Sequence, residues 1–352
     1  MRGDRNADAA RLSAIIERFP RQQILVLGDF VADEFVFGDI SRVSREAPVL
    51  ILRRREIHTL PGGGANAANN LADLGAKVYP VATLGDDAAG DTLVEYFRRK
   101  KVDISGLIRK NGWTTPAKTR FLAGWPHTAL QQVLRVDREP EGLSDAAADA
   151  LVRNARRRLD ETSAVLISDY GYGAAAPDII GKVRGRKSWG RPATLDSRYR
   201  LHEFAALDLA AATPNEAEIE AAHHEPIGGD ASKLDRLARR TMAQLNLNAL
   251  VVTRGRHGMT VFEEGRAPQA LPVCGSDQAV DVTGAGDTVI AALTLALAAG
   301  ATVLQAARIA NYAGGIVVMK RGTATVTREE LLAAVRGDAQ KRHDEAGNGH
   351  AK

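Results

Sequence analysis

The residue types best suited to chemistry lie in the stretch VDVTGAGDTVIAALTLALAAG, residues 280–300. Gly284 and Gly286 open an apolar segment that has the composition of a buried helix. The first N–H groups of a helix lack partners within it and lie at the positive end of the helix dipole, so they can bind an anion. Asp287 adds a carboxylate at the same point. A base beside an anion-binding helix start indicates an enzyme site.

Polar residues and a glycine follow several apolar runs of strand length. In an open α/β sheet the carboxyl ends of the strands line the ligand crevice, so we expect these residues to converge on one site. Any single one of them could instead only cap a helix. They are Asp29, Asp169, Asp196, Asn215 and Gly255.

Most of the chain alternates between strand-like and helix-like segments. QILVLGD, KVYPVATLG and AVLISDY are apolar runs of strand length, whereas DAAADALVRNARRRL and ASKLDRLARRTMAQL have helical spacing. This alternation predicts an α/β fold with a mostly parallel sheet covered on both faces. Residues 33–60 and 115–137 contain short β-like runs and no convincing helix. They predict a small sheet that projects from the main domain and could cover a site or pair with a second copy.

Composition excludes several classes of protein. The 352 residues carry a formal charge of only +4, and the basic residues scatter in short knots, so we expect solvated faces and no nucleic-acid partner. No apolar run approaches the roughly eighteen residues of a membrane span. The first residues mix acids with arginines and lack a secretion signal, so we expect a cytoplasmic protein without a membrane partner. A single cysteine, Cys274, excludes an internal disulfide.

Other site chemistries have weaker support. GKVRGRKS has an arginine where a phosphate-binding P-loop has its second glycine. Gly171 and Gly173 follow a strand as in a dinucleotide-binding loop, but an intervening aspartate would face the pyrophosphate unfavourably. His223 and His224 are adjacent, so no helix can aim both at one zinc ion. The G-x-S-x-G elbow of esterases is absent.

DVTGAGDT resembles the signature of the ribokinase/PfkB family of sugar kinases, and the likeness covers roughly residues 22–335. Further family landmarks follow in order: GDFVAD, PGGGANAANNLADLGA, TPNEAEIE and VTRGRHGM. Within the family, SREAPVLIL, AKTRFL, QQVLRVD and ISDYGYG resemble segments of bacterial heptose-7-phosphate kinases, although LDSR stands where D-P-K is expected. The resemblance implies a ribokinase-like fold with a small β-sheet lid, and phosphoryl transfer from ATP with Mg²⁺.

The resemblance also implies roles for the residues around DVTGAGDT. The amides of Gly284, Ala285 and Gly286 would hold the γ-phosphoryl group of ATP. Asp287 would accept the proton of the attacking sugar hydroxyl. Because Asp287 stands at a helix N-terminus, we expect its pKa to be lowered.

The N-x-x-E pair Asn215 and Glu218 is assigned by the resemblance to the nucleotide phosphates and, through water, to Mg²⁺. Asn215 could instead be an ordinary helix cap. Asp281 and Thr283 match positions that bind a monovalent cation in some relatives, which makes K⁺ a candidate cofactor. The further nucleotide contacts are Thr253, Gly255, Gly258 and Asn311.

On the sugar side, Asp33 and Asn66 correspond to residues that hydrogen-bond substrate hydroxyls. Cations on the lid suit a sugar that already carries a phosphate, or they form a solvated face. These lid cations are Lys118, Arg120 and Arg135. The glycines that would let the backbone approach the sugar closely are Gly62, Gly63 and Gly64.

The implied reaction is transfer to the anomeric hydroxyl of D-glycero-D-manno-heptose 7-phosphate. The alternatives are another acceptor (ribose, a fructose phosphate or a nucleoside) and a catalytically idle sugar-binding protein. We expect an N-terminal extension over residues 1–21, a kinase domain over 22–336 and a disordered tail over 337–352. We also expect a homodimer through the lid, because a second copy could cover its sheet edges.

Overall fold

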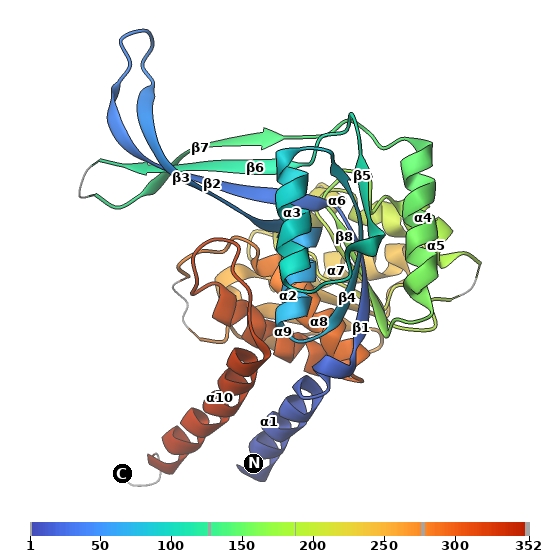
Figure 1. The fold of residues 1–352 in the computed structure, drawn as a ribbon. Helices are drawn as coiled ribbons and strands as arrows, with labels where there is room; N and C mark the ends of the chain where they lie inside the picture. Colours follow the sequence, from blue (N-terminus) through green and yellow to red (C-terminus); the bar gives the residue numbers. More distant parts are fainter. Residues whose placement is uncertain (1, 126–127, 187, 276–278, 349–352) are drawn as a thin grey trace.

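The computed structural model describes residues 2–125, 128–186, 188–275 and 279–348, and strands alternate with helices along most of the chain (Figure 1). Nine strands form one sheet, in which β12 and its two neighbours pair antiparallel and all the other pairs are parallel. The predicted mostly parallel sheet is therefore confirmed. In spatial order the strands are β13 (Gln269–Leu271), β12 (Met259–Glu263), β11 (Ala249–Thr253), β10 (Ala211–Ala212), β9 (Ala193–Ser197), β8 (Ala164–Asp169), β1 (Gln23–Gly28), β4 (Lys77–Gly85) and β5 (Leu107–Lys110).

Helices cover both faces of this sheet. In β1, Ile24 and Val26 belong to one buried core, whereas Leu25 and Leu27 belong to the other. Successive strand side chains point to opposite faces, so an unbroken apolar run fits a strand covered on both sides. The first core contains residues of α1 (Arg2–Ile16), α2 (Gly64–Asp73), α3 (Ala88–Arg99), α8 (Ala285–Ala298), α9 (Val303–Val317) and α10 (Arg328–Asn348). The second contains residues of α4 (Asp145–Leu159), α5 (Pro177–Arg184), α6 (Glu216–His223) and α7 (Ala231–Leu245).

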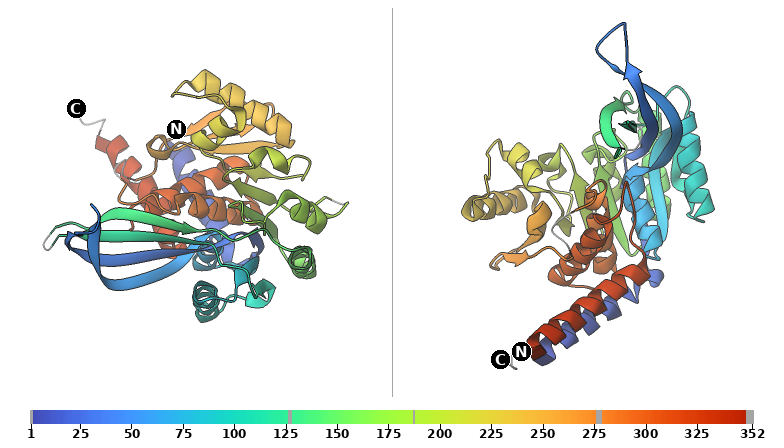
Figure 2. Two further views of the ribbon diagram at one scale, coloured as in Figure 1. Left: turned by 90° about the horizontal axis from the view of Figure 1, so that it is seen from above. Right: turned by 90° about the vertical axis from the view of Figure 1, so that its left-hand side faces the viewer.

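A second sheet of four strands projects from the body, and we call it the lid (Figures 1 and 2). Two antiparallel pairs form its sides, and its two central strands, β2 and β6, run parallel. The predicted projecting sheet is confirmed, and it lies where the β-like segments 33–60 and 115–137 placed it. Its strands in spatial order are β3 (Leu50–Gly63), β2 (Phe30–Val43), β6 (Ala117–Gly124) and β7 (Gln131–Arg138).

The two ends of the chain pack together. Helices α1 and α10 lie side by side and antiparallel (Figures 1 and 2). Leu12 and Ile16 of α1 are buried, and Glu17 pairs with Arg336 at 2.8 Å, so the residues before 22 contribute to the core instead of extending from it. We expected the domain to end at residue 336, whereas α10 continues to Asn348, a segment that contains several good helix formers. Residues 349–352 of the expected tail lie outside the described residues.

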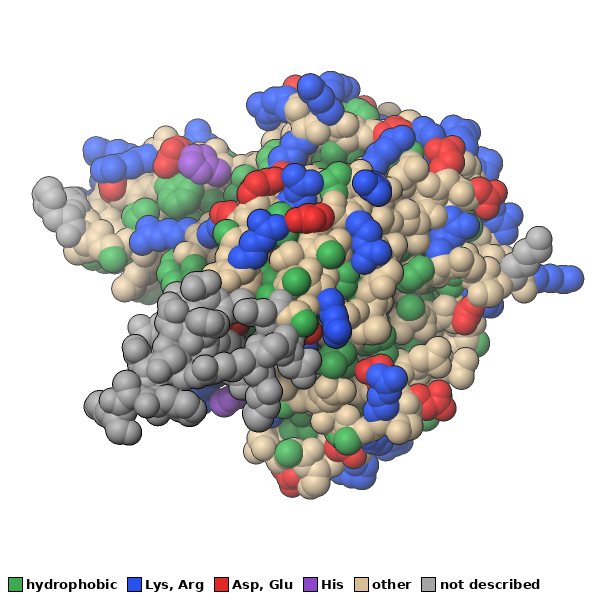
Figure 3. All heavy atoms as spheres, turned by 90° about the horizontal axis from the view of Figure 1, so that it is seen from below, with side chains coloured by type: hydrophobic (Ala, Val, Ile, Leu, Met, Phe, Trp, Pro, Cys, Tyr) green, Lys and Arg blue, Asp and Glu red, His purple; other side chains and the backbone are tan. Residues whose placement is uncertain are grey.

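The charged surface is mixed in sign. Figure 3 shows lysine and arginine side chains spread over one face among acidic and uncharged ones. One arginine of each of the clusters at 53–55 and 156–158 has an acidic partner: Arg55 pairs with Asp39 at 2.6 Å, and Arg158 pairs with Asp103 at 2.7 Å. Among the helices of the described ranges, none has both the length and the apolar character to cross a bilayer.

Candidate active site

Asp287 lies in the first turn of α8 and is only 3% exposed. Its Oδ2 accepts a hydrogen bond from Asn66 Nδ2 at 2.9 Å, and its Oδ1 accepts one from the Tyr170 hydroxyl at 2.8 Å. Burial raises the pKa of Asp287 to about 7, although both hydrogen bonds act to lower it. The expected lowering by the helix start is wrong, because desolvation outweighs it. A carboxyl group with a pKa near neutrality suits a general base.

The start of α8 leaves three amides without an acceptor among the described residues. Gly284 has φ +77°, and a Cβ there would lie 2.4 Å from Asn66 Nδ2, so the turn requires glycine. The amide of Ala285 donates to a carbonyl oxygen three residues back at 3.2 Å and is therefore engaged. The amides of Gly284, Gly286 and Asp287 donate to no described residue. Two residues of the predicted anion site, Gly284 and Gly286, thus have free amides, Asp287 adds a third, and anion binding there stays a prediction.

A buried polar network joins α2 to α8 behind the carboxylate. Asn70 Nδ2 donates to Asn66 Oδ1 at 3.2 Å, and the Thr288 hydroxyl donates to Asn70 Oδ1 at 3.0 Å. A fully bonded buried network holds its members in place, so it directs the amide of Asn66 toward Asp287. The role predicted for Asn66 in binding a sugar hydroxyl stays a prediction.

The lid brings charged residues to the same place. Asp33 of β2 and Lys118 of β6 are register partners, and Arg120 donates to Asp33 at 2.7 Å. Lys118 is 8% exposed, and its ammonium lies 4.6 Å from the centroid of the Tyr170 ring. No described carboxylate lies within ion-pair distance of it, and burial, then the charge of Arg198, lowers the pKa of Lys118. A buried cation without an ionic partner is costly unless a ligand supplies an anion.

The other predicted lid cations already have partners. Arg135 of β7 faces Arg120 in the register and binds both oxygens of Asp137, at 2.7 and 2.5 Å. Arg120 is neutralised by Asp33. Of the three lid cations singled out in the sequence, Lys118 is therefore the one whose charge is left for a ligand.

The three glycines near the lid are explained by contacts within the protein. A Cβ on Gly62 would lie 2.5 Å from Asp33 Oδ2, so this glycine makes room for the carboxylate. Gly63 has φ +56°, and the amide of Gly64 donates to the carbonyl of Asp29 at 2.9 Å. Contacts within the protein thus account for these glycines, and their close approach to a sugar stays a prediction.

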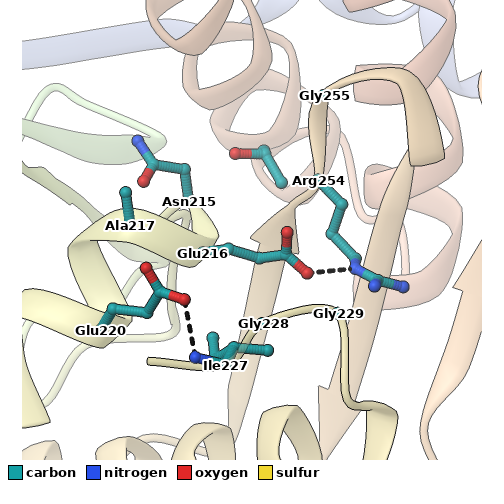
Figure 4. Close-up of a pocket in the computed structure, with 10 residues that line it drawn as sticks. Asn215, Glu216, Ala217, Glu220, Ile227, Gly228, Gly229, Arg254 and Gly255 are labelled. Atoms are coloured by element: carbon teal, nitrogen blue, oxygen red, sulfur yellow. Dashed lines mark hydrogen bonds and ion pairs between the residues drawn. The ribbon is translucent and has the colours of Figure 1, made fainter. Parts of the chain in front are cut away.

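An open pocket of about 450 Å³ lies between α6, the loop that follows it and the end of β11 (Figure 4). Its lining includes Asn215, Thr253 and Gly255, which the sequence assigned to the nucleotide. Asn215 Oδ1 accepts from the amide of Glu218 at 2.8 Å, and Glu218 Oε2 accepts from the amide of Asn215 at 2.9 Å. This reciprocal capping box shows that Asn215 does cap α6.

A run of carboxylates connects this pocket with α8. Asp196 is the penultimate residue of β9 and lies near Glu218. Burial, then the charges of Glu218 and Asp287, raises the pKa of Asp196 well above its usual range. Burial also raises the pKa of Glu218. Mg²⁺ is commonly held by one or two carboxylates together with phosphate oxygens, so this donor set fits it. Within the described chain, no three His, Cys, Asp or Glu residues form a metal cage without such help.

Three of the predicted nucleotide contacts lie outside the pocket lining: Glu218, described above, Asn311 and Gly258. Asn311 is buried and donates to the carbonyl of Pro272 at 2.7 Å. Gly258 has φ +79°, and a Cβ there would lie 2.1 Å from the carbonyl oxygen of Leu271, so close packing beside β13 requires it. Asn311 and Gly258 therefore have structural roles, and their contact with a nucleotide stays a prediction.

The pair assigned to a monovalent cation is brought together in a turn. Asp281 Oδ1 accepts from the amide of Thr283 at 2.9 Å, and Oδ2 accepts from the amide of Gly322 at 2.9 Å. Partial burial opposes ionisation, but these hydrogen bonds outweigh it and lower the pKa of Asp281. The ionised carboxylate braces the approach to α8, and its binding of K⁺ stays a prediction.

Residues 22–130 and 200–330 match the profile of pfkB family carbohydrate kinases. The chain belongs to this family. This match confirms the predicted family and the prediction that the chain is a carbohydrate kinase. This pfkB-family kinase is 37% identical over 329 residues to the bifunctional protein HldE of Caulobacter sp. (strain K31), covering 93% of this chain and 65% of the relative. It is 39% identical over 334 residues to HldE of Mesorhizobium japonicum, and the match covers 92% of this chain and 64% of that relative. The chain thus spans less than two thirds of either relative.

Solved structures show the same fold for this pfkB-family kinase. Arabidopsis thaliana ribokinase complexed with ribose and ATP matches with a TM-score of 0.69 at 23% identity, over 89% of this chain and 98% of that one. Escherichia coli phosphofructokinase-2, in complex with substrates and products, matches with a TM-score of 0.71 at 17% identity. This match covers 90% of this chain and 98% of that one. The predicted ribokinase-like fold is confirmed.

Sequence reasoning missed Tyr170 and Arg198 as site residues of this pfkB-family kinase. Tyr170 follows β8 and binds Asp287. Arg198 follows β9, and no described acidic group lies within ion-pair distance of it, although its charge affects the pKa of Lys118 on one side and of Glu218 on the other. Both directly follow strand ends that were expected to line the site. Their position after a strand was therefore the feature of the sequence that could have identified them as site residues.

Two of the strand-end acids serve the loop that carries Tyr170. Asp169 is buried, bonds the Ser197 hydroxyl at 2.7 Å and pairs with Arg200 at 2.5 Å. Burial, then the charge of Asp169, raises the pKa of Asp29 to about 6, despite three hydrogen bonds from backbone amides. Of the predicted strand-end residues, Asn215 and Gly255 thus line the pocket and Asp196 lies beside Glu218, whereas Asp29 and Asp169 accept hydrogen bonds from amides of the loop. Their convergence on one ligand stays a prediction.

Proposed function

We propose that this kinase transfers the γ-phosphoryl group of ATP to the anomeric hydroxyl of a phosphorylated sugar, with D-glycero-D-manno-heptose 7-phosphate as the preferred acceptor and heptose 1,7-bisphosphate as product. The observation that carries the proposal is the buried Asp287 carboxylate beside the helix-start amides that donate to no described residue. The choice of heptose rests on the sequence segments shared with heptose-7-phosphate kinases, and the similarity to HldE over more than nine tenths of this chain is consistent with it.

In the proposed reaction the sugar hydroxyl gives its proton to Asp287 while its oxygen attacks the γ-phosphorus. The bond between that phosphorus and the bridging oxygen breaks, and ADP leaves with the electron pair. The amides of Gly284, Gly286 and Asp287, with the positive end of α8, would stabilise the charge on the moving group. Glu218 would hold Mg²⁺ through water, with Asp196 nearby, and the ion would neutralise charge on the phosphates.

We place the nucleotide in the pocket of Figure 4, with its phosphates directed past Glu218 and Asp196 toward α8. Asn215, Thr253 and Gly255 line this pocket. The ion pair between Glu216 and Arg254, at 2.7 Å, forms one wall. The support for this path is electrostatic, because Glu218, Asp196 and Asp287 repel one another unless a cation such as Mg²⁺ lies between them, and the same cation would draw the phosphates there.

A panel of acceptors tests the substrate. We expect heptose 7-phosphate to be phosphorylated faster than ribose, fructose 1-phosphate or a nucleoside, with the product identified by phosphorus NMR and the rate by release of ADP. Turnover of ribose or fructose 1-phosphate without turnover of the heptose would show another sugar kinase. No turnover of any sugar would favour an idle sugar-binding protein.

Lys118→Met tests the phosphate on the acceptor. Because Lys118 is the lid cation left without an ionic partner, we expect its loss to raise the KM for the phosphorylated sugar by about tenfold or more and to leave the KM for ATP unchanged. Lys182→Met, at an exposed lysine of α5, is the matched control. Equal effects of both variants on the sugar KM would contradict this role.

We also propose a homodimer through the lid. Large apolar side chains are exposed on its strands, where a monomer would leave them in water. Leu134 and Val136 of β7 are 55% and 48% exposed and, being two residues apart, share a face. We expect the wild type to sediment as a dimer and Leu134→Glu to sediment as a folded monomer. A wild type that is monomeric at micromolar concentration would contradict the proposal.

A further inference from the structure

We propose that Tyr170 is the positioning residue for Asp287, and that the glycine-rich loop over residues 170–174 serves to fix the Tyr170 hydroxyl against that carboxylate. The inference rests on the function proposed above, in which Asp287 is the base. It is carried by the 2.8 Å hydrogen bond from Tyr170 to Asp287 Oδ1. This inference gives a role to the ISDYGYG segment, which in the sequence was noted for its resemblance to heptose-7-phosphate kinases and to a dinucleotide-binding loop.

The carboxylate of Asp287 is held from two sides. Asn66 of α2 donates to one oxygen, and Tyr170, which follows β8, donates to the other. Rotation of a carboxylate about its last torsion is soft, so a single donor would leave the plane of the group poorly defined. With both donors in place the plane is set, and each oxygen keeps a lone pair for the substrate hydroxyl.

Tyr170 is in turn fixed by a carboxylate inside the protein. Asp29, 2% exposed, accepts hydrogen bonds from the amides of Tyr170 and Tyr172 at 2.9 Å each and from the amide of Ala174 at 2.8 Å. The positive φ values of the intervening Gly171 and Gly173, +84° and +103°, let the loop close around the carboxylate. The loop that resembles a dinucleotide-binding turn thus binds an internal anion.

The surroundings keep the Tyr170 hydroxyl a donor. Burial, then the charge of Asp287, raises the pKa of Tyr170 well above its usual range, so the phenol stays protonated at every pH at which the kinase would be assayed. Tyr170 therefore supports the base and does not replace it. The charged groups that face this pair are Asp33 and Lys118 from the lid, and Asp196 and Arg198 at the end of β9.

Tyr170→Phe removes the hydroxyl and keeps the ring. We expect kcat to fall by about ten- to a hundredfold, with the KM for ATP unchanged. The hydroxyl lowers the pKa of Asp287, so its loss raises that pKa, and the acid limb of kcat/KM against pH should move up by about one pH unit. A residue with only a structural role would leave this limb in place.

Two matched variants isolate the effect. Tyr172→Phe alters the same loop at a tyrosine whose hydroxyl does not bond Asp287, and Tyr79→Phe removes a buried hydroxyl that bonds Glu161 at 3.3 Å, away from the site. We expect both to keep the wild-type acid limb, with thermal unfolding recorded for all three variants. Replacing the six tyrosines by the more acidic 3-fluorotyrosine strengthens the donor without altering the backbone, and it should move the acid limb to lower pH even if Tyr170→Phe fails to fold.

The outcomes separate this inference from the proposed function. An acid limb unmoved by both Tyr170→Phe and 3-fluorotyrosine, or by the fluorinated protein alone if the variant does not fold, overturns the positioning role. An Asp287→Asn protein that keeps its turnover overturns the assignment of the base instead. If the acid limb moves to higher pH in Tyr170→Phe and to lower pH in the 3-fluorotyrosine protein, and Asp287→Asn loses its turnover, the positioning role and the assignment of the base are both supported.

Discussion

Asp287→Asn is expected to lower kcat by about 10²–10⁴-fold, because the amide cannot accept the proton of the sugar hydroxyl. The KM for ATP and the affinity for ATP, measured by calorimetry, should change little, since the side chain acts on the acceptor. Release of ADP in the presence of the sugar gives the rate. Asp178→Asn, at an exposed aspartate in the first turn of α5, is the control for loss of a helix-start charge and should behave like the wild type.

The same substitution has an expected effect on stability. The pKa of Asp287 is about 7 in the folded protein and about 3.8 when unfolded, so folding favours its protonated form. Between about pH 4 and pH 7 the unfolded protein loses this proton while the folded protein keeps it, so the free energy of unfolding falls as pH rises. Above about pH 7 the folded protein is ionised too, and the loss of stability is complete. Asp287→Asn should lack this pH dependence and melt no lower than the wild type at pH 8. For the activity, a rate of ADP release by Asp287→Asn within a few fold of the wild-type rate would contradict the assignment of Asp287 as the base.

Gly284→Ala is expected to remove most activity and to destabilise the fold. Its backbone φ of +77° is strained for alanine, and the new Cβ would lie 2.4 Å from the Asn66 amide that holds Asp287. We expect the free energy of unfolding to fall by about 1–3 kcal/mol and kcat to fall by about a hundredfold or more. Urea unfolding and release of ADP measure the two effects.

Gly286→Ala is the contrasting variant for stability. A Cβ there meets no atom within 4 Å, and the residue lies in α8, where alanine is favoured over glycine. Its free energy of unfolding should equal or exceed that of the wild type. If Gly284→Ala were as stable and as active as the wild type, the tight turn before α8 would not be needed to place Asn66 and Asp287.

Local sequence predicted the elements of the fold well, because the signals are local. The unbroken apolar runs of β1 and β8 and the helical spacing of α4 and α7 depend only on neighbouring residues. DVTGAGDT likewise identified the start of α8, since a glycine pair before an apolar helix is a local pattern. The capping box of Asn215 and Glu218 was visible as spacing, although only the structure showed that the two residues bond each other.

Features that depend on distant segments were missed. The pKa of Asp287 was expected to be low from its helix position, but α2 and the loop after β8 bury it, and neither is close to it in sequence. Tyr170 and Arg198 lie at strand ends whose convergence was foreseen without knowing which side chains would meet. Arg120 and Arg135 of the lid pair with Asp33 and Asp137, so among the described residues Lys118 is the one of the three without an ionic partner. Such pairing cannot be predicted from residue types.

The central claim is that the start of α8 holds the migrating phosphoryl group while Asp287 receives the acceptor's proton. A crystal structure with a non-hydrolysable ATP analogue, Mg²⁺ and heptose 7-phosphate tests it most directly. We predict the terminal phosphate within hydrogen-bond distance of the amides of Gly286 and Asp287, and the anomeric hydroxyl within hydrogen-bond distance of the Asp287 carboxylate. A triphosphate bound away from residues 284–287, or an acceptor hydroxyl out of reach of Asp287, would contradict the account.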